Sequence, residues 1–425
     1  MAYLESIKFV KNKSADWRNK TVLVRCDFDV PLDADKIKDD SRLKASLLTI
    51  KFLLKNKCQI ILMGHLGRPN GKVVLELGLK PVQQRLEELL KTKIELVKFG
   101  EISPSVKNKR DEKNKIIMLE NLRFWLGEEK NDKNFARQLA SLADIYVNEA
   151  FAVSHRACAS VDAIKNYLPS YAGFNLTKEI EKLSQVLNRP PRPLVAIIGG
   201  AKIETKLPVL DKFLAKADYL LVGGAIANNF FKILNYEVGQ SLIDREYLPA
   251  AKKLWQKSKS GALNFVVKDK QLVVDNELIG SKLDLATIKN LRHKIVLPID
   301  VAVKNLKTQE KEIKTPNQVN LNDKILDIGP QTLEFYGRII KGARCVVWNG
   351  PMGQFEAPEF ALGTFGVAEL IIKSRARAVM GGGETEEALK GVLHNKELPR
   401  RIFVSTGGGA MLEFLGGKKL PGLEK

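Results

Sequence analysis

The 425-residue sequence has few cysteines, and none of the four lies in a Cys-x-x-Cys pair. No apolar run reaches the roughly 18 residues that a membrane span needs. The Lys-rich N-terminal stretch has no continuous apolar core, so we expect neither a secretory signal nor a membrane partner. Without an export signal, we expect reduced, buried thiols in a cytoplasmic protein. The four histidines show no metal-ligand spacing such as His-Glu-x-x-His.

Two common nucleotide-binding patterns are also missing. The sequence contains no G-x-x-x-x-G-K-[ST], which excludes a P-loop protein. It contains no G-x-G-x-x-G, which excludes the usual dinucleotide-binding turn. Any nucleotide must therefore bind to a different set of glycine turns.

Positive charge exceeds negative charge, with 69 Lys and Arg against 49 Asp and Glu, a net charge of +20. This excess permits nucleic-acid binding, since phosphate contacts supply most non-specific affinity. However, 50 of the 69 are Lys spread along the whole chain, and no RNA-recognition, zinc-finger or helix-turn-helix signature accompanies them. We expect no nucleic-acid partner. A basic nucleic-acid-binding protein remains an alternative that rests on charge alone.

Short apolar, β-branched runs alternate with longer helical patterns, and the length favours two domains. This regular alternation of strands and helices predicts a parallel α/β sheet. The strand runs are almost entirely apolar, which is typical of strands buried on both faces. The predicted strands are 21–26, 58–63, 115–119, 144–148, 194–198, 219–222, 263–267, 295–299, 344–348, 377–380 and 401–404.

The middle of the chain carries a boundary. Residues 176–188 are predicted to form an amphipathic helix, and the RPPRP sequence at 189–193 cannot continue it. A new apolar strand starts at Leu194. We therefore predict two α/β halves joined by a helix.

The strand ends of the two halves differ in chemistry. Of 31 glycines, 24 follow residue 188, where they form turns at the ends of predicted strands. The corresponding turns of the first half carry charge, as in RCDFD (25–29) and GHLGR (64–68). Glycine turns let phosphates approach the backbone, whereas Arg matches phosphate and carboxylate. Because ligands of open α/β sheets bind at the carboxyl ends of strands, the pattern predicts an anionic substrate on one half, a nucleotide on the other, and a kinase that closes on them.

Over nearly its whole length the chain closely resembles the phosphoglycerate kinase family. The motifs that carry the resemblance occur in the family's order: VRCDFDVPL (24–32), GHLGRPNG (64–71), LENLRF (119–124), YVNEAF (146–151) with HRA (155–157), GGAKIETK (199–206), DIGPQT (327–332), VWNGPMGQFE (347–356), GGGET (381–385) and STGGGAMLEFLGGKKLPG (405–422).

The resemblance implies an α/β protein of two Rossmann-like domains with parallel sheets, joined by a helix and a hinge. It implies a cytoplasmic, monomeric kinase of glycolysis and gluconeogenesis that uses Mg²⁺ and takes 3-phosphoglycerate and ATP/ADP as substrates. The implied parts are a phosphoglycerate-binding domain (1–175), an interdomain helix (176–189), a nucleotide-binding domain (190–404) and a segment returning to the first domain (405–425).

The resemblance also assigns site residues. Arg42 and Lys202 are the implied catalytic residues, because both carry charge toward the transferring phosphoryl group. The implied substrate-binding residues are Asp27, Asp29, Arg42, His65, Arg68, Arg123 and Arg156. The implied nucleotide-binding residues are Gly200, Ala201, Lys202, Lys206, Gly223, Gly224, Asn349, Glu356, Gly381, Gly382, Gly383, Glu384 and Thr385. Glu384 is the implied Mg²⁺ ligand.

Three residues and one insertion depart from the family pattern. Asp29 replaces an Asn, and we expect Arg25 or Arg42 to neutralise it. Glu149 and Glu384 each replace an Asp, and the longer Glu384 is expected to shift the metal or to favour Mn²⁺. Residues 268–290 are an insertion, expected to form a peripheral hairpin or helix. These changes leave open a second alternative, a catalytically impaired relative that still binds nucleotide.

Overall fold

The computed structural model describes residues 7–11, 16–102, 116–259, 265–268, 271–274, 277–278, 294–393 and 397–424. The chain divides into two compact units. The first unit holds residues 1–181 and 419–425, and the second unit holds residues 182–418. Within the described residues, no helix combines the length and the apolarity needed to cross a membrane.

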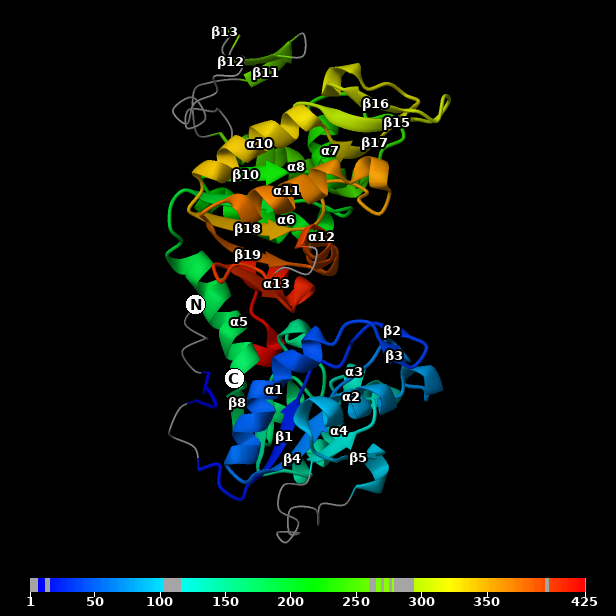
Figure 1. Ribbon diagram of the computed structural model, residues 1–425, viewed down its shortest axis with the longest axis vertical. Coiled ribbons are helices and arrows are strands. Elements are labelled where there is room, and N and C mark those ends of the chain that lie inside the picture. The colour runs from blue at the N-terminus through cyan, green and yellow to red at the C-terminus, as the bar shows by residue number, and fades with distance from the viewer. Residues whose placement is uncertain are drawn as a thin grey trace. The chain divides into compact units, whose positions relative to one another are not determined.

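The first unit is built on a six-stranded parallel sheet (Figure 1). Its spatial order is β5 (Ile94–Val97), β6 (Ile116–Leu119), β4 (Gln59–Met63), β1 (Thr21–Arg25), β7 (Ile145–Asn148) and β8 (Ser170–Ala172). The four central strands were predicted to within one or two residues. The edge strands β5 and β8 were missed, because short edge strands lack the continuous apolar run that marks a buried one.

Both faces of this sheet are covered. Val22 and Val24 of β1 join a core with α1 (Ser41–Lys55) and α2 (Lys80–Leu90). Leu23 between them joins a separate core with α4 (Lys133–Ser141). Alternate side chains of a strand point to opposite faces, so this division explains why the three central residues of β1, Val22, Leu23 and Val24, are all apolar.

The second unit repeats the plan with another six-stranded parallel sheet (Figure 1). Its order is β14 (Ile295–Val296), β10 (Tyr219–Val222), β9 (Leu194–Ile198), β18 (Cys345–Asn349), β19 (Arg377–Gly381) and β20 (Ile402–Ser405). Its helices are α6 (Leu207–Lys216), α7 (Gly224–Ile233), α8 (Leu248–Lys257), α10 (Pro330–Gly342), α11 (Leu362–Lys373), α12 (Gly383–Leu393) and α13 (Gly408–Leu415). The predicted fold of two Rossmann-like α/β domains is confirmed.

An antiparallel sheet that the sequence analysis did not predict is added to the second unit. β15 (Val301–Asn305) pairs with β16 (Lys311–Lys314) on one side and β17 (Asp323–Ile328) on the other. β16 alternates exposed and half-buried residues, and β17 has three half-buried residues between buried ends. Both strands carry Lys and acidic residues. They lack the apolar runs on which the strand predictions relied.

A strand does lie at the end of the range predicted over 263–267, but its expected place in a parallel sheet was wrong. β11 (Phe265–Lys268) instead pairs antiparallel with β12 (Gln271–Val274), which pairs with β13 (Glu277–Leu278). The expectation of a hairpin in the insertion is met by β12 and β13, which pair antiparallel. Residues 269–270, 275–276 and 279–290 of the insertion lie outside the described part of the chain.

Helix α5 (Phe174–Asn188) corresponds to the helix predicted over 176–188 and begins two residues earlier. It starts in the first unit and ends in the second. Near the C-terminus, residues 419–425 belong to the first unit, where the N–H of Gly422 donates to the carbonyl of Ser154 at 2.8 Å. The side chain of Lys165 donates to the carbonyls of Pro421 and Glu424. All four cysteines are buried and unpaired, as predicted.

Candidate active site

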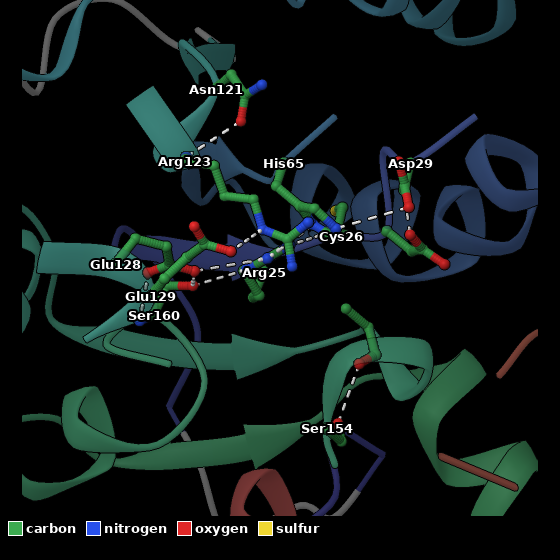
Figure 2. Close-up of polar contacts among 12 residues, drawn as sticks. Arg25, Cys26, Asp29, His65, Asn121, Arg123, Glu128, Glu129, Ser154 and Ser160 are labelled. Atoms are coloured by element: carbon green, nitrogen blue, oxygen red, sulfur yellow. Dashed lines mark hydrogen bonds and ion pairs between the residues drawn. The ribbon is translucent and has the colours of Figure 1, made fainter. Parts of the chain in front are cut away.

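The charged turns of the first unit converge on Arg25, the last residue of β1. Its side chain is 1% exposed. Nε donates to Oγ of Ser160 at 2.8 Å, and Nη1 donates to the carbonyl of Cys26 at 2.6 Å. Nη2 lies 3.1 Å from Nδ1 of His65 and 3.7 Å from Oε1 of Glu128 (Figure 2). A buried guanidinium needs such partners, since an unpaired buried charge is costly.

Glu128 completes this buried network. Its Oε1 accepts the hydroxyl of Ser160 at 2.6 Å, and its Oε2 accepts the Ser160 N–H at 3.0 Å. The sequence analysis did not select Arg25, Glu128 or Ser160 as site residues. The available signal was that Arg25 is the single charged residue of a buried strand, so its charge must be paired inside the fold.

His65 lies at the centre of the positive cluster and is 2% exposed. Its pKa is held well below its ordinary value by burial and then by the charges of Arg25, Arg123, Arg156 and Arg42. The structure therefore brings together His65 and three of the predicted substrate arginines, together with Arg25. The ring is neutral at physiological pH, so the cluster's positive charge belongs to the arginines alone.

Arg123 is held rigidly beside His65. It lies in the short 3₁₀ turn Leu122–Phe124, and the side chain of Asn121 accepts its N–H. Nη1 donates to the carbonyl of Gly67 at 2.7 Å, and Nε lies 3.3 Å from Oε1 of Glu129 (Figure 2). Burial lowers the pKa of Arg123, and the Glu129 carboxylate raises it in part.

Arg156 and Arg68 are held less tightly. Nε of Arg156 donates to Nε2 of His155 at 3.4 Å, so His155 contacts its neighbour in the chain. Arg68 is exposed, and within the described residues no hydrogen bond or ion pair joins its side chain to the cluster. The prediction that Arg68 grips substrate stays untested.

The two aspartates of the first turn have different partners. Nη1 of Arg42, in the first turn of α1, lies 3.3 Å from Oδ1 and 3.1 Å from Oδ2 of Asp27. Burial raises the pKa of Asp27, and Arg42 opposes the rise. Oδ1 of Asp29 accepts the N–H of Gly67 at 2.9 Å, and its Oδ2 lies 3.8 Å from Nε2 of His65. The expectation that Arg25 or Arg42 neutralises Asp29 was therefore wrong: Arg42 pairs with Asp27, and Arg25 pairs with Glu128.

The second unit contains a cavity of about 610 Å³ at the carboxyl ends of its sheet strands. Five of the predicted nucleotide residues line it: Gly200, Ala201, Gly224, Glu356 and Glu384. Apolar side chains that the sequence analysis did not select supply part of the wall: Phe231, Leu242, Pro298, Val301 and Met352. A pocket of this size, with apolar walls and a few polar groups, is typical of small-molecule sites.

Glycine is required where the turns of this cavity cross. Gly350 has φ +86°, and a Cβ there would lie 2.4 Å from the carbonyl oxygen of Gly199. Gly224 has φ +58°, and a Cβ there would lie 2.9 Å from the backbone nitrogen of Gly200. These left-handed conformations and close approaches require glycine at both positions.

Polar contacts involve four more of the predicted nucleotide residues, none of which lines this cavity: Lys206, Asn349, Gly381 and Thr385. The side chain of Lys206 donates to Oδ1 of Asn349, and Nδ2 of Asn349 donates to the carbonyl of Gly381 at 2.5 Å. Oγ1 of Thr385 accepts the N–H of Gly350 at 2.9 Å. Burial lowers the pKa of Lys206 to about 8, although the charge of Glu384 raises it. Lys206 is thus a cation whose charge depends on pH near neutrality.

Four other predicted nucleotide residues take different positions. Lys202 is exposed in the turn after β9, and within the described residues no hydrogen bond or ion pair engages its side chain. Gly223, Gly382 and Gly383 do not line the cavity but flank the helices that border it, α7 and α12.

Asp327 is a cavity residue that the sequence analysis did not select. It lies in the unpredicted strand β17, is 3% exposed, and accepts the N–H groups of Gly363 at 2.7 Å and Ile328 at 2.9 Å. Burial raises its pKa to about 7 despite these two hydrogen bonds. Asp327 begins the DIGPQT motif, but because β17 lacks an apolar run, the sequence did not show that this residue lies at the cavity wall.

Comparisons with known proteins agree on one family. The family model described as phosphoglycerate kinase matches residues 12–289 and 269–418. The chain is 42% identical to the phosphoglycerate kinase of Moorella thermoacetica over 419 residues and 39% identical to that of Finegoldia magna over 417 residues. Each alignment covers 97% of both chains.

Solved structures give the same result. The phosphoglycerate kinase of Coxiella burnetii is similar with a TM-score of 0.78 and 35% identity, and that of Pyrococcus horikoshii with a TM-score of 0.74 and 29% identity. Each comparison covers 98% of both chains.

Proposed function

The chain belongs to the phosphoglycerate kinase family, and from that premise we propose how its residues carry out the family's reaction. The activity is reversible phosphoryl transfer between 1,3-bisphosphoglycerate with ADP and 3-phosphoglycerate with ATP, a step of glycolysis and gluconeogenesis. The observation that carries the assignment of roles is the separation of an arginine cluster in one unit from a glycine-lined cavity in the other.

The first unit binds 3-phosphoglycerate. Arg123 and Arg156, with the exposed Arg68, hold the phosphate that is not transferred, because guanidinium groups match phosphate in a bidentate fork. Neutral His65 donates from Nε2 without adding charge. Binding energy at this remote phosphate orients the carboxyl group that reacts. Asp27 accepts hydrogen bonds from substrate and holds Arg42, which approaches the transferring phosphoryl group.

The second unit binds the nucleotide in its 610 Å³ cavity. The apolar wall that includes Phe231 and Met352 takes the adenine, and Glu356 contacts the ribose. Lys206, Asn349 and Thr385 lie with the glycine turns where the phosphates bind. Backbone N–H groups at helix N-termini are suited to these oxygens.

Lys202 and Arg42 stabilise the charge that develops during transfer. The transition state of phosphoryl transfer is loose, with charge on the equatorial oxygens, so positioning and cations supply most of the catalysis. The exposed ammonium of Lys202 is available for this role. Because each ligand is assigned to a different unit, the two units must hold the ligands next to each other for transfer, and we propose that hinge bending achieves this and excludes water.

Magnesium is the proposed metal, and one carboxylate of the described residues is suited to hold it. Among them, no group of three His, Cys, Asp or Glu side chains is placed to hold a metal ion. Mg²⁺ commonly binds through one or two carboxylates together with substrate phosphates. Glu384 is an exposed carboxylate that lines the nucleotide cavity, so it is the group that would hold the ion. The metal would neutralise charge on the phosphates.

The remaining features follow the family. We propose that the protein is a cytoplasmic, hinge-bending monomer whose partners are its small-molecule substrates. The net charge of +20 is proposed to belong to a solvated, Lys-rich surface, without a nucleic-acid or membrane partner.

The direct test is steady-state transfer from MgATP to 3-phosphoglycerate, with the acyl phosphate coupled to NADH oxidation. We expect turnover in the usual enzymatic range of about 1 to 10³ s⁻¹. The contrary result is no turnover from folded protein that still binds ADP. That result would favour the alternative that the protein is a catalytically impaired relative that still binds nucleotide.

A further inference from the structure

A second cavity of the second unit lies at the edge of the parallel sheet opposite the nucleotide cavity. Its volume is about 430 Å³. It is bordered by Cys345 and Arg377, the first residues of β18 and β19, and by the last turns of α5. The glycine turns of the nucleotide site follow the other ends of the same strands. β18 and β19 each have five residues. At a rise of about 3.3 Å per residue, the two edges of the sheet lie roughly 15 Å apart.

The lining of this cavity is strongly basic. Five basic side chains contribute to it: Lys182, Arg189, Arg377, Arg400 and Arg401. All of its lining residues belong to the described part of the chain, and none of them is acidic. Burial raises the pKa of the Cys345 thiol to about 11, so this group supplies no negative charge either.

Arg401 is the one basic group that is already engaged. Its Nε donates to the carbonyl of Ser374 at 3.0 Å, and its Nη2 donates to the carbonyls of Ser374 and Ile372. These bonds hold the end of α11 against the start of β20. Arg401 therefore forms part of the wall and is not a free ligand.

The other four basic groups are available. In the described part of the chain, no hydrogen bond or ion pair engages the side chains of Lys182, Arg189, Arg377 or Arg400. Charge pairing does occur close by, since Nη1 of Arg192 lies 2.9 Å from Oδ1 of Asp218. The cavity thus brings several positive side chains together. None of its lining residues is an acidic partner of the kind that Asp218 is for Arg192.

We propose that this cavity binds a small organic phosphate with at least two anionic groups, at a site separate from both substrates. Arg377 and Arg400 match phosphate oxygens, whereas Lys182 of α5 and Arg189, which directly follows this helix, add positive charge from another part of the wall. Val186, Pro191 and Phe403 offer apolar surface to a carbon skeleton. The volume lies within the range of small-ligand pockets, which favours a compact ligand over a nucleic-acid strand.

The test uses inorganic pyrophosphate as the probe, with isothermal titration calorimetry at constant ionic strength and Mg²⁺. The whole protein is first saturated with 3-phosphoglycerate and MgADP, which do not react with each other and fill the substrate sites. We expect one pyrophosphate to bind per chain. The double variant Arg377→Gln/Arg400→Gln should weaken this binding at least tenfold.

The matched control is Arg375→Gln/Lys253→Gln, which removes the same charge from two exposed residues outside the cavity. The control should bind pyrophosphate within twofold of the wild type. Absence of binding once the substrate sites are filled, or equal losses in both variants, would overturn the proposal. The proposal would also be overturned if an oligonucleotide of twelve nucleotides bound more tightly than pyrophosphate and if its binding required Arg377 and Arg400.

Discussion

Nη2 of Arg25 lies 3.1 Å from Nδ1 of His65, and this contact fixes the tautomer of the ring. A guanidinium can only donate, so Nδ1 accepts and the ring proton resides on Nε2. Burial and the surrounding arginines hold the pKa of His65 well below its ordinary value. His65 therefore presents a neutral N–H donor on the side of Asp29.

Replacing Arg25 should destabilise the first unit. Arg25→Met leaves Glu128 buried with Ser160 as a partner but without its cation, and we expect a loss of about 3 kcal/mol. The measurement is denaturant unfolding, with Arg18→Met on the exposed surface as a control. Arg25→Met/Glu128→Gln should recover part of the loss, because no uncompensated charge remains. A free energy of unfolding within about 0.5 kcal/mol of the wild type would contradict this reading.

Replacing Asp29 should strengthen substrate binding. Asp29→Asn keeps an oxygen for the Gly67 N–H, removes a negative charge near an anionic ligand and adds a donor. We expect the KM for 3-phosphoglycerate to fall about threefold to tenfold, which corresponds to about 1 kcal/mol. Asp33→Asn removes the same charge from an exposed residue and should leave this KM unchanged. An unchanged KM in Asp29→Asn counts against the hypothesis.

Glu149 should make stability depend on pH. It is 2% exposed, accepts the hydroxyl of Thr49 at 2.7 Å and the N–H of Asn175 at 3.0 Å, and so holds the start of α5. Burial raises its pKa to about 8 from an ordinary value of 4.5. Between these values the folded state binds the proton that the unfolded state has lost, so stability falls as pH rises.

The measurement is the free energy of unfolding across pH 5 to 8 in the wild type and in Glu149→Gln. The difference between the two curves isolates Glu149 from the other titrating groups. We expect the wild type to lose stability relative to the variant as pH rises. Parallel curves would show that Glu149 titrates normally or not at all in this window.

The titration of Lys206 should make kcat/KM for MgATP depend on pH. Its pKa of about 8 means that the free enzyme loses this cation as pH rises through that value. We expect kcat/KM for MgATP to fall above pH 8, because kcat/KM reports groups of the free enzyme. Lys206→Arg keeps its charge and should move the fall to higher pH. The same profile in both proteins would contradict the assignment.

The two parallel sheets could be predicted because their strands are apolar at nearly every position. β16 and β17 could not, since their interspersed Lys, Glu and Asp residues resemble a solvated loop, and the apolar run of β15 is only three residues long. Asp327 and much of the wall of the nucleotide cavity were missed with them. The strand predicted over 263–267 is apolar too, but pairing direction depends on neighbours that a local run does not specify.

The resemblance identified the arginines of the first unit but not their partners. Arg25 forms an ion pair with Glu128, more than 100 residues away along the chain. Arg42 forms an ion pair with Asp27 and not with the nearby Asp29. Such choices depend on side-chain geometry at strand ends, which residue spacing does not encode. The charge of a residue could therefore be predicted, whereas its partner required the structure.

The central claim is that Lys202 acts on the transferring phosphoryl group and contributes little to ground-state binding. The most direct test is Lys202→Met, with kcat measured together with the dissociation constants of 3-phosphoglycerate and MgADP, and with the exposed Lys252→Met as control. We predict that kcat falls about 10²-fold to 10³-fold while both dissociation constants stay within about threefold. A kcat within threefold of the wild type, or a loss confined to nucleotide binding, would contradict the account.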